Sequence, residues 1–192
     1  MNFLKSKGFI TAGIIILIVI IIIAAVAGSY NGLVKSQTSL EEAYADIDTQ
    51  LQRRSDLIPN LVSTVKGYAS HEEEVFKDVS DARAALASAG NIKDKSDANS
   101  QLDSAVSRLL AIAENYPELK ANENFLSLQD ELSGTENRIS VARTRYNEAA
   151  KSYNVKVRKF PTNIFANIFG FDKADYFEAA ESAKNAPQVS FE

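Results

Sequence analysis

The chain begins with a long apolar run. No residue between Lys7 and Lys35 is charged, and positions 9–29 are almost entirely aliphatic or small. A helix rises about 1.5 Å per residue, so this run covers the roughly 30 Å hydrocarbon core of a bilayer. Positions 25–27 read Ala-Val-Ala, the form of a signal-peptide cleavage site, but such peptides usually have only about 7–15 apolar residues. The length favours a retained transmembrane helix at 9–29, after a short flank at 1–8.

Beyond the run, apolar residues recur at alternating steps of four and three. One such string covers positions 40–68 and is broken only by Arg54. A second covers positions 125–153 and is broken only by Thr135. This spacing places one apolar seam along each helix, which has to be buried against other helices. The pattern therefore predicts two long helices with coiled-coil-like seams.

Two shorter helices are predicted between the long ones. Ser70-His71-Glu72-Glu73 has the form of a capping box, and the helix it opens should end near Gly90-Asn91. Ser96 is a candidate start for the next helix, which should end before Tyr116-Pro117. No stretch alternates with period two over the length of a strand. The chain is therefore predicted to be all-α.

The short connectors favour antiparallel neighbours, which gives an up-down-up-down four-helix bundle with two long and two shorter helices over residues 30–160. An aromatic segment and tail follow at 161–192. A heptad pattern also allows the two long helices to slip past one another by seven residues. In this topology the end of the last helix returns to the start of the first, next to the membrane.

The first long helix contains an unusual segment. Pro59 removes a helical hydrogen bond and crowds the preceding turn, so a kink is expected near Ser55. A structural interpretation pairs Arg54 with an acid such as Glu136 or Asp56, because partly buried charges usually persist only in pairs. A functional interpretation makes the segment a docking notch for a partner. The candidate contact residues are Arg53, Arg54, Asp56, Pro59 and Asn60.

A second candidate site is the basic and aromatic segment 151–171. A cationic stretch followed by a short amphipathic helix could rest on anionic lipid headgroups. Alternatively, its phenylalanines cap the open end of the bundle core. The candidate membrane-proximal residues are Lys151, Lys156, Arg158, Lys159, Phe160, Phe165, Phe169 and Phe171.

Charge bears on partners and sidedness. The chain has 21 Lys and Arg against 25 Asp and Glu, and three of the basic residues flank the apolar run. The domain is therefore acidic, and nucleic acid is not expected as a partner. Lys5 and Lys7 precede the span, which favours a cytoplasmic N-terminus and an extracytoplasmic domain. The basic residues 151–159 would instead suit the anionic cytoplasmic leaflet.

The inventory of reactive residues is poor. There is no cysteine, and His71 is the single histidine. One histidine cannot supply the two Glu-x-x-His pairs of a dimetal site in a bundle. G-x-S-x-G, P-loop and dinucleotide-binding motifs do not occur. We therefore expect no enzymatic activity, no catalytic residue, no metal site and no cofactor.

Several strings resemble the LemA family. They are Tyr30-Asn31-Gly32-Leu33-Val34, the run from Gln50 to Val62 (QLQRRSDLIPNLV), Lys66 to Glu72, Tyr116-Pro117, Glu136 to Ile139 with Arg143 and Tyr146-Asn147, and Phe160 to Ile164 with Phe169-Gly170-Phe171. The resemblance covers essentially the whole chain. It implies a bacterial membrane protein with a four-helix bundle, in a family whose members include magnetosome-linked proteins and proteins encoded near membrane proteases. It implies no reaction and no catalytic residues.

These observations predict a non-enzymatic scaffold anchored by a single span in the bacterial cell (inner) membrane. It would contact the bilayer through 9–29 and bind another membrane or envelope protein. The alternative is a module that organises membrane through segment 151–171 and self-associates, which leaves a homo-oligomer open.

Overall fold

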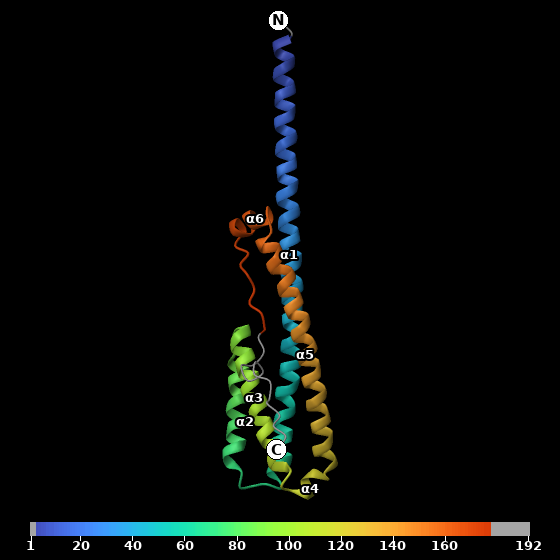
Figure 1. Cartoon of the computed structure of the whole chain (residues 1–192), viewed down its shortest axis with the longest axis vertical. Helices are drawn as coiled ribbons and strands as arrows, with labels where there is room; N and C mark the ends of the chain where they lie inside the picture. Colours follow the sequence, from blue (N-terminus) through green and yellow to red (C-terminus); the bar gives the residue numbers. More distant parts are fainter. Residues whose placement is uncertain (1–2, 178–192) are drawn as a thin grey trace, which may run out of the picture. The chain divides into compact units, whose positions relative to one another are not determined.

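A computed structural model describes residues 3–177, with side chains from residue 10 onward, as helices joined by short turns. The helices are α1 (Phe3–Lys66), α2 (Glu73–Ser88), α3 (Ile92–Ala113), α4 (Pro117–Lys120), α5 (Glu123–Arg158) and α6 (Thr162–Phe169) (Figure 1). No strand occurs among these residues, so the predicted all-α class is confirmed. The predicted aromatic segment and tail at 161–192 is described as far as residue 177, and its remainder lies outside the described residues.

Helix α1 is an unbroken helix of 64 residues. It contains both the apolar run and the first predicted long helix, because nothing at their junction disfavours helix strongly enough to end it. In the described part of the chain, α1 is the one helix long and apolar enough to cross a membrane. The aliphatic side chains of its N-terminal part are exposed. Pro59 lies inside α1, which continues to Lys66.

The contacts within the chain define two compact units. Among the described residues, unit 1 consists of 3–41 and 149–174, and unit 2 consists of 42–148 and 175–177. Helices α1 and α5 each contribute to both units, while α6 belongs to unit 1 and α2, α3 and α4 belong to unit 2.

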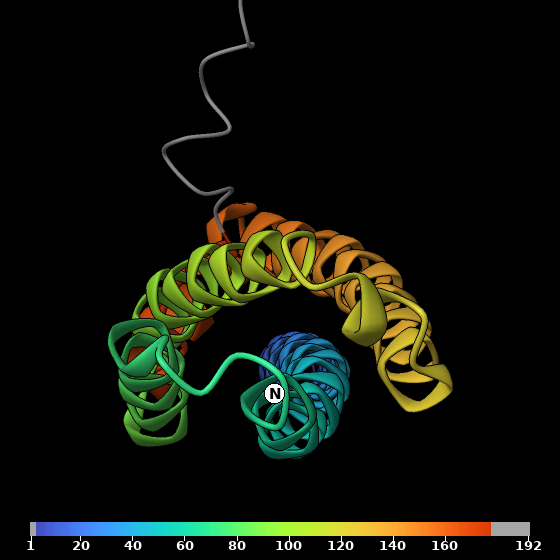
Figure 2. The ribbon, with the colours of Figure 1, turned by 90° about the horizontal axis from the view of Figure 1, so that it is seen from below.

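In unit 2 the predicted seams are buried. The apolar side chains buried from α1 are Ile47, Leu51, Ile58, Leu61 and Val65, and those from α5 are Phe125, Leu132, Ile139, Ala142 and Tyr146. The two residues that break the strings, Arg54 and Thr135, are buried as well. Helices α2 and α3 lie side by side (Figures 1 and 2), and Arg108 on α3 pairs with Asp78 on α2. Tyr68 is 39% exposed because it lies past the end of α1.

The helix starts differ from those predicted. Helix α2 begins at Glu73 with Glu72 in the N-cap position and no side-chain capping bond, so Ser70 does not cap it. Helix α3 begins at Ile92, where the Asn91 side-chain oxygen accepts a hydrogen bond of 2.8 Å from the backbone N–H of Asp94. Asparagine is among the strongest N-cap residues, so α3 starts before Ser96, which is buried inside it.

Candidate functional site

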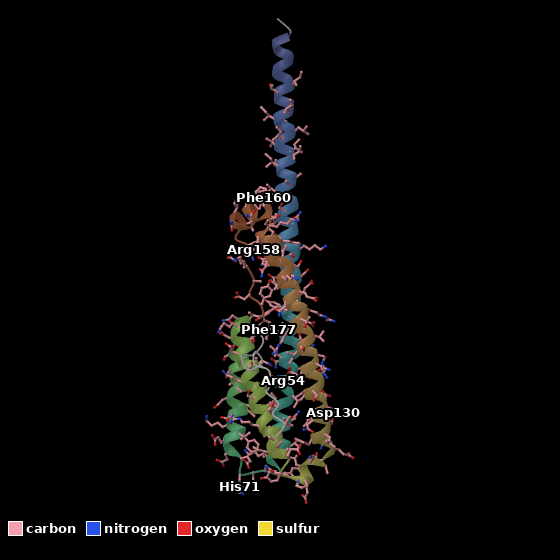
Figure 3. All side chains as sticks on the ribbon, in the orientation of Figure 1. Arg54, His71, Asp130, Arg158, Phe160 and Phe177 are labelled. Atoms are coloured by element: carbon pink, nitrogen blue, oxygen red, sulfur yellow. The ribbon has the colours of Figure 1, made fainter. Side chains whose placement is uncertain are left out.

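Arg54 forms the centre of a charged cluster in unit 2 (Figure 3). Its side chain is 7% exposed, and its Nη1 donates a 2.5 Å hydrogen bond to Oε2 of Glu136 on α5. The same nitrogen pairs with Asp103 on α3. The predicted partner Glu136 is therefore present, whereas Asp56 is exposed and accepts a 2.8 Å hydrogen bond from Gln52. Asp103 was not predicted as a partner.

Burial sets the electrostatics of this cluster. Loss of solvation raises the pKa of Asp103, against the lowering effect of Arg54. Loss of solvation also lowers the pKa of Arg143, against the raising effect of Glu136 and Asp103. Two cations and two carboxylates thus offset one another across α1, α3 and α5. These charged contacts link α1, α3 and α5 within unit 2.

The candidate partner contact therefore divides. Arg54 was predicted to contact a partner, but its guanidinium is buried and paired, so it is not available on the surface. Arg53 is exposed, and its Nη2 lies 3.3 Å from Oε2 of Glu131. Pro59 and Asn60 are also exposed. Together with Asp56 they form a polar stripe along α1. A hollow beside α1 is lined on that helix by Asp48, Thr49, Leu51, Gln52 and Ser55, and on its other side by Leu86, Ala87, Ala89 and Lys95.

The segment 151–171 lies in unit 1 and has a buried side. Phe171 belongs to an apolar cluster with Leu33, Tyr153, Val157 and Ala166. The ring of Tyr30 meets those of Phe169 and Phe171 edge to face, with centroids 5.1 and 5.8 Å apart. Phe171 is therefore buried in an apolar cluster of unit 1.

The same segment has an exposed apolar side. Phe160 is 74% exposed, Ile168 68%, and Ile164 and Phe169 almost half. Phe165 is half-buried. The exposed basic side chains are Lys151, Arg158 and Lys159, and Lys156 Nζ lies 3.5 Å from the carbonyl oxygen of Gly32. Figure 3 shows Arg158 and Phe160 at the junction of α5 and α6.

His71 lies in the turn between α1 and α2, exposed to solvent (Figure 3). Among the residues that the structure describes, no group of three or more His, Cys, Asp or Glu side chains is placed to hold a metal ion.

Sequence reasoning missed the residues that bind the non-helical segment after α6. Asn147 and Tyr146 hold backbone atoms of residues 175–177 in unit 2, and Asn154 holds Ala174 in unit 1. A spacing of seven between two asparagines on one predicted helix was the available signal. It does not by itself identify what the side chains bind.

Comparisons with known proteins agree with the resemblance. The sequence model of the LemA family matches residues 43–191. Magnetosome protein MamQ 2 of Paramagnetospirillum magneticum is 28% identical over 191 residues, which cover 86% of this chain and 70% of that protein. Magnetosome protein MamQ of Magnetospirillum gryphiswaldense is 26% identical, with 83% and 70% covered. Protein LemA of Metamycoplasma hominis is 28% identical over 155 residues, with 80% and 71% covered.

Proposed function

The chain belongs to the LemA family, and on that premise we propose that it is a non-enzymatic scaffold protein anchored in the bacterial cell membrane. The observation that supports this most directly is helix α1. Its N-terminal part is apolar and exposed, whereas one apolar face of its C-terminal part is buried in unit 2. One continuous helix would therefore join a membrane span at 9–29 to the helical domain.

In this proposal the chain crosses the inner membrane once, with the domain on the extracytoplasmic side. The test is protease added outside intact spheroplasts that express the full chain with a C-terminal tag. We expect loss of the tag while a cytoplasmic control protein survives. Survival of both would contradict the proposed orientation and place the domain in the cytoplasm.

We further propose that the domain is an antiparallel up-down-up-down four-helix bundle. Contacts between α1 and α5 support an antiparallel pair, because residue numbers rise along one helix as they fall along the other. The contacts are Asp46 with Arg145 at 3.6 Å, Gln50 with Arg138 at 3.2 Å and Arg53 with Glu131 at 3.3 Å. Short turns join α1 to α2 and α2 to α3, as this topology requires.

The polar stripe on α1, with Arg53, Asp56, Pro59 and Asn60, is the proposed contact for another membrane or envelope protein. A photo-crosslinking residue in place of Asn60, in the full chain and in native membranes, tests this. We expect one defined adduct from Asn60 and none from Asn124, an exposed asparagine on α5. Equal adducts from both positions, or none from Asn60, would contradict the contact.

A second candidate function is membrane contact through segment 151–171. The specific observation is that the exposed apolar residues of α6 lie in the same unit as Tyr30, which follows the apolar run directly and touches Phe169. Aromatic residues at the end of a span are typical of the interface between lipid and water. Exposed Arg158 and Lys159 would pair with anionic headgroups just outside it.

Spin labels can test this contact, because the chain has no cysteine of its own. Single variants Ile168→Cys and Val141→Cys would be labelled in the full chain and placed in anionic vesicles. Both parent side chains are exposed aliphatic residues. We expect the label at 168 to be relaxed by oxygen and shielded from a water-soluble nickel chelate, and the label at 141 to show the reverse. Matching behaviour at the two positions would contradict lipid contact by α6.

A further inference from the structure

Charge is divided unevenly between the two units. The described part of unit 2 has 12 basic side chains against 20 acidic ones. Unit 1 shows the opposite balance after the apolar run, with six basic side chains against two acidic ones, Glu41 and Asp172. The six basic residues are Lys35, Lys151, Lys156, Arg158, Lys159 and Lys173. Although the whole chain has a net charge of −4, the unit that contains the apolar run is positive beyond it.

The basic side chains of unit 1 are not neutralised by acids. The ion pairs in the described part of the chain lie within unit 2. In unit 1 the basic side chains other than Lys156 are exposed. Lys156 and Arg158 lie in the last turn of α5, where cations complement the helix dipole. That local role does not extend to Lys159, Lys35 or Lys173, which leaves positive charge available to an external anion.

Exposed apolar side chains lie beside this charge. Phe160 directly follows Lys159 and is 74% exposed, and Ile168 on α6 is 68% exposed. The ring of Phe169 on α6 contacts that of Tyr30, at the end of the apolar run, with centroids 5.1 Å apart. Cations combined with exposed aromatic and aliphatic side chains at the end of a span match the bilayer interface, where phosphates meet acyl chains. The apolar side chains favour a lipid over a soluble polyanion.

We propose that unit 1 selects anionic phospholipids, whose phosphates pair with Arg158 and Lys159 while Phe160 contacts their acyl chains. The proposal rests on lipid contact by segment 151–171 and adds the class of lipid. A guanidinium can donate two parallel hydrogen bonds to a phosphate, and an ammonium group adds a point charge. A zwitterionic headgroup carries its own cation beside the phosphate, so the attraction to it is weaker. One basic residue near an anionic surface favours association by roughly fivefold.

The test uses a single tryptophan, because the chain has none of its own. Phe160→Trp replaces one exposed ring by another. The full chain is reconstituted in bilayers with the same mixture of phosphatidylglycerol and phosphatidylcholine in both leaflets. In parallel samples one lipid or the other carries bromine near the headgroup end of its acyl chains. Bromine quenches tryptophan on contact, so the two samples give the relative affinity of the lipids for position 160.

We expect the affinity for phosphatidylglycerol to exceed that for phosphatidylcholine by roughly fivefold at position 160. The preference should fall as salt is added, because exposed charges are screened. Equal quenching by the two lipids would overturn the selectivity and leave lipid contact intact. Ile18→Trp, inside the apolar run, reports insertion and should be quenched by both lipids alike. Quenching at position 18 without quenching at position 160 would overturn both the selectivity and the lipid contact.

Two matched double variants test which charges are responsible. Arg158→Gln with Lys159→Gln, in the Phe160→Trp chain, should abolish the preference while quenching by lipid persists. Arg145→Gln with Lys120→Gln removes the same charge from exposed side chains of unit 2 and should leave the preference unchanged. An equal effect of the two double variants would show that the net charge of the chain sets the preference, and it would overturn the proposal.

Discussion

Arg54 offers the sharpest test of how unit 2 is held together. Arg54→Ala removes the guanidinium that pairs with Asp103 and Glu136 and leaves both carboxylates without it. Breaking a fully buried ion pair costs about 3–5 kcal/mol. Here the two acid side chains are 36% and 43% exposed, so water recovers part of this loss. We expect destabilisation of about 2–3 kcal/mol, between the fully buried value and the surface value.

The neighbouring Arg53 provides a matched control. It pairs with Glu131 at 3.3 Å, and both side chains are about half exposed. Exposed pairs contribute about 0–1 kcal/mol and are screened by salt. Arg53→Ala should therefore have a small effect that vanishes at high ionic strength, whereas the effect of Arg54→Ala should persist.

The assay is thermal unfolding of the full chain in detergent, followed by circular dichroism. One kcal/mol shifts the midpoint by about 2–4 °C in a chain of this size, so Arg54→Ala should lower it by about 4–12 °C. Replacing Arg54 by Met together with Asp103→Asn should restore part of the loss, because a buried pair removed as a whole costs less than a broken one. Equal midpoints for Arg54→Ala and Arg53→Ala would refute the reasoning.

Three further predictions concern the same unit. Burial raises the pKa of Asp103 in the folded protein above its ordinary value of 3.8. The protonated side chain therefore contributes stability that is complete below pH 3.8 and is lost as the pH rises through the folded-state pKa. Wild type should therefore gain stability relative to Asp103→Asn as the pH falls from 7 toward 4, and parallel thermal midpoints that do not diverge would contradict this. Asn91→Ala removes the bond from Asp94 N–H and should cost about 1 kcal/mol in urea unfolding, and no change would mean the cap is unimportant. By the same assay, Ile139→Ala at a fully buried site should lower the free energy of unfolding by about 2–5 kcal/mol. Val141→Ala, at a side chain 52% exposed, should lower it by less than about 0.5 kcal/mol. Similar losses for the two variants would contradict the assigned faces of α5.

Periodicity was sufficient to predict the buried faces of the two long helices. The three-and-four spacing on α1 and α5 identified seams that are buried at Ile47, Ile58 and Ile139. It also located Arg54 in a seam, which made an acidic partner necessary and Glu136 a candidate. These predictions succeed because burial of a helix face depends on residues within the same helix.

Contacts that depend on a second element were harder to predict. Asp103 could not be assigned to Arg54, because periodicity within one helix does not show which side chain of another helix a charged residue will meet. Asn147 and Asn154 bind a segment without regular structure, for which periodicity carries no information. For the segment 151–171 the sequence allowed either contact with lipid or capping of the core. In the structure some of its side chains are buried, such as Phe171, and others are exposed, such as Phe160.

The pairing of Arg54 with Glu136 also bears on how the two long helices are aligned. Hydrophobic seams with a seven-residue repeat fit nearly as well after a shift of one repeat. A shift one way would set Arg54 against Gln129, which is neutral, and a shift the other way would set it against Arg143, a like charge. Each misaligned state removes the contact between Arg54 and Glu136 and leaves the buried cation with Asp103 on α3 as its remaining partner. A single buried charge thus specifies the register of the two long helices, which aliphatic side chains alone cannot do.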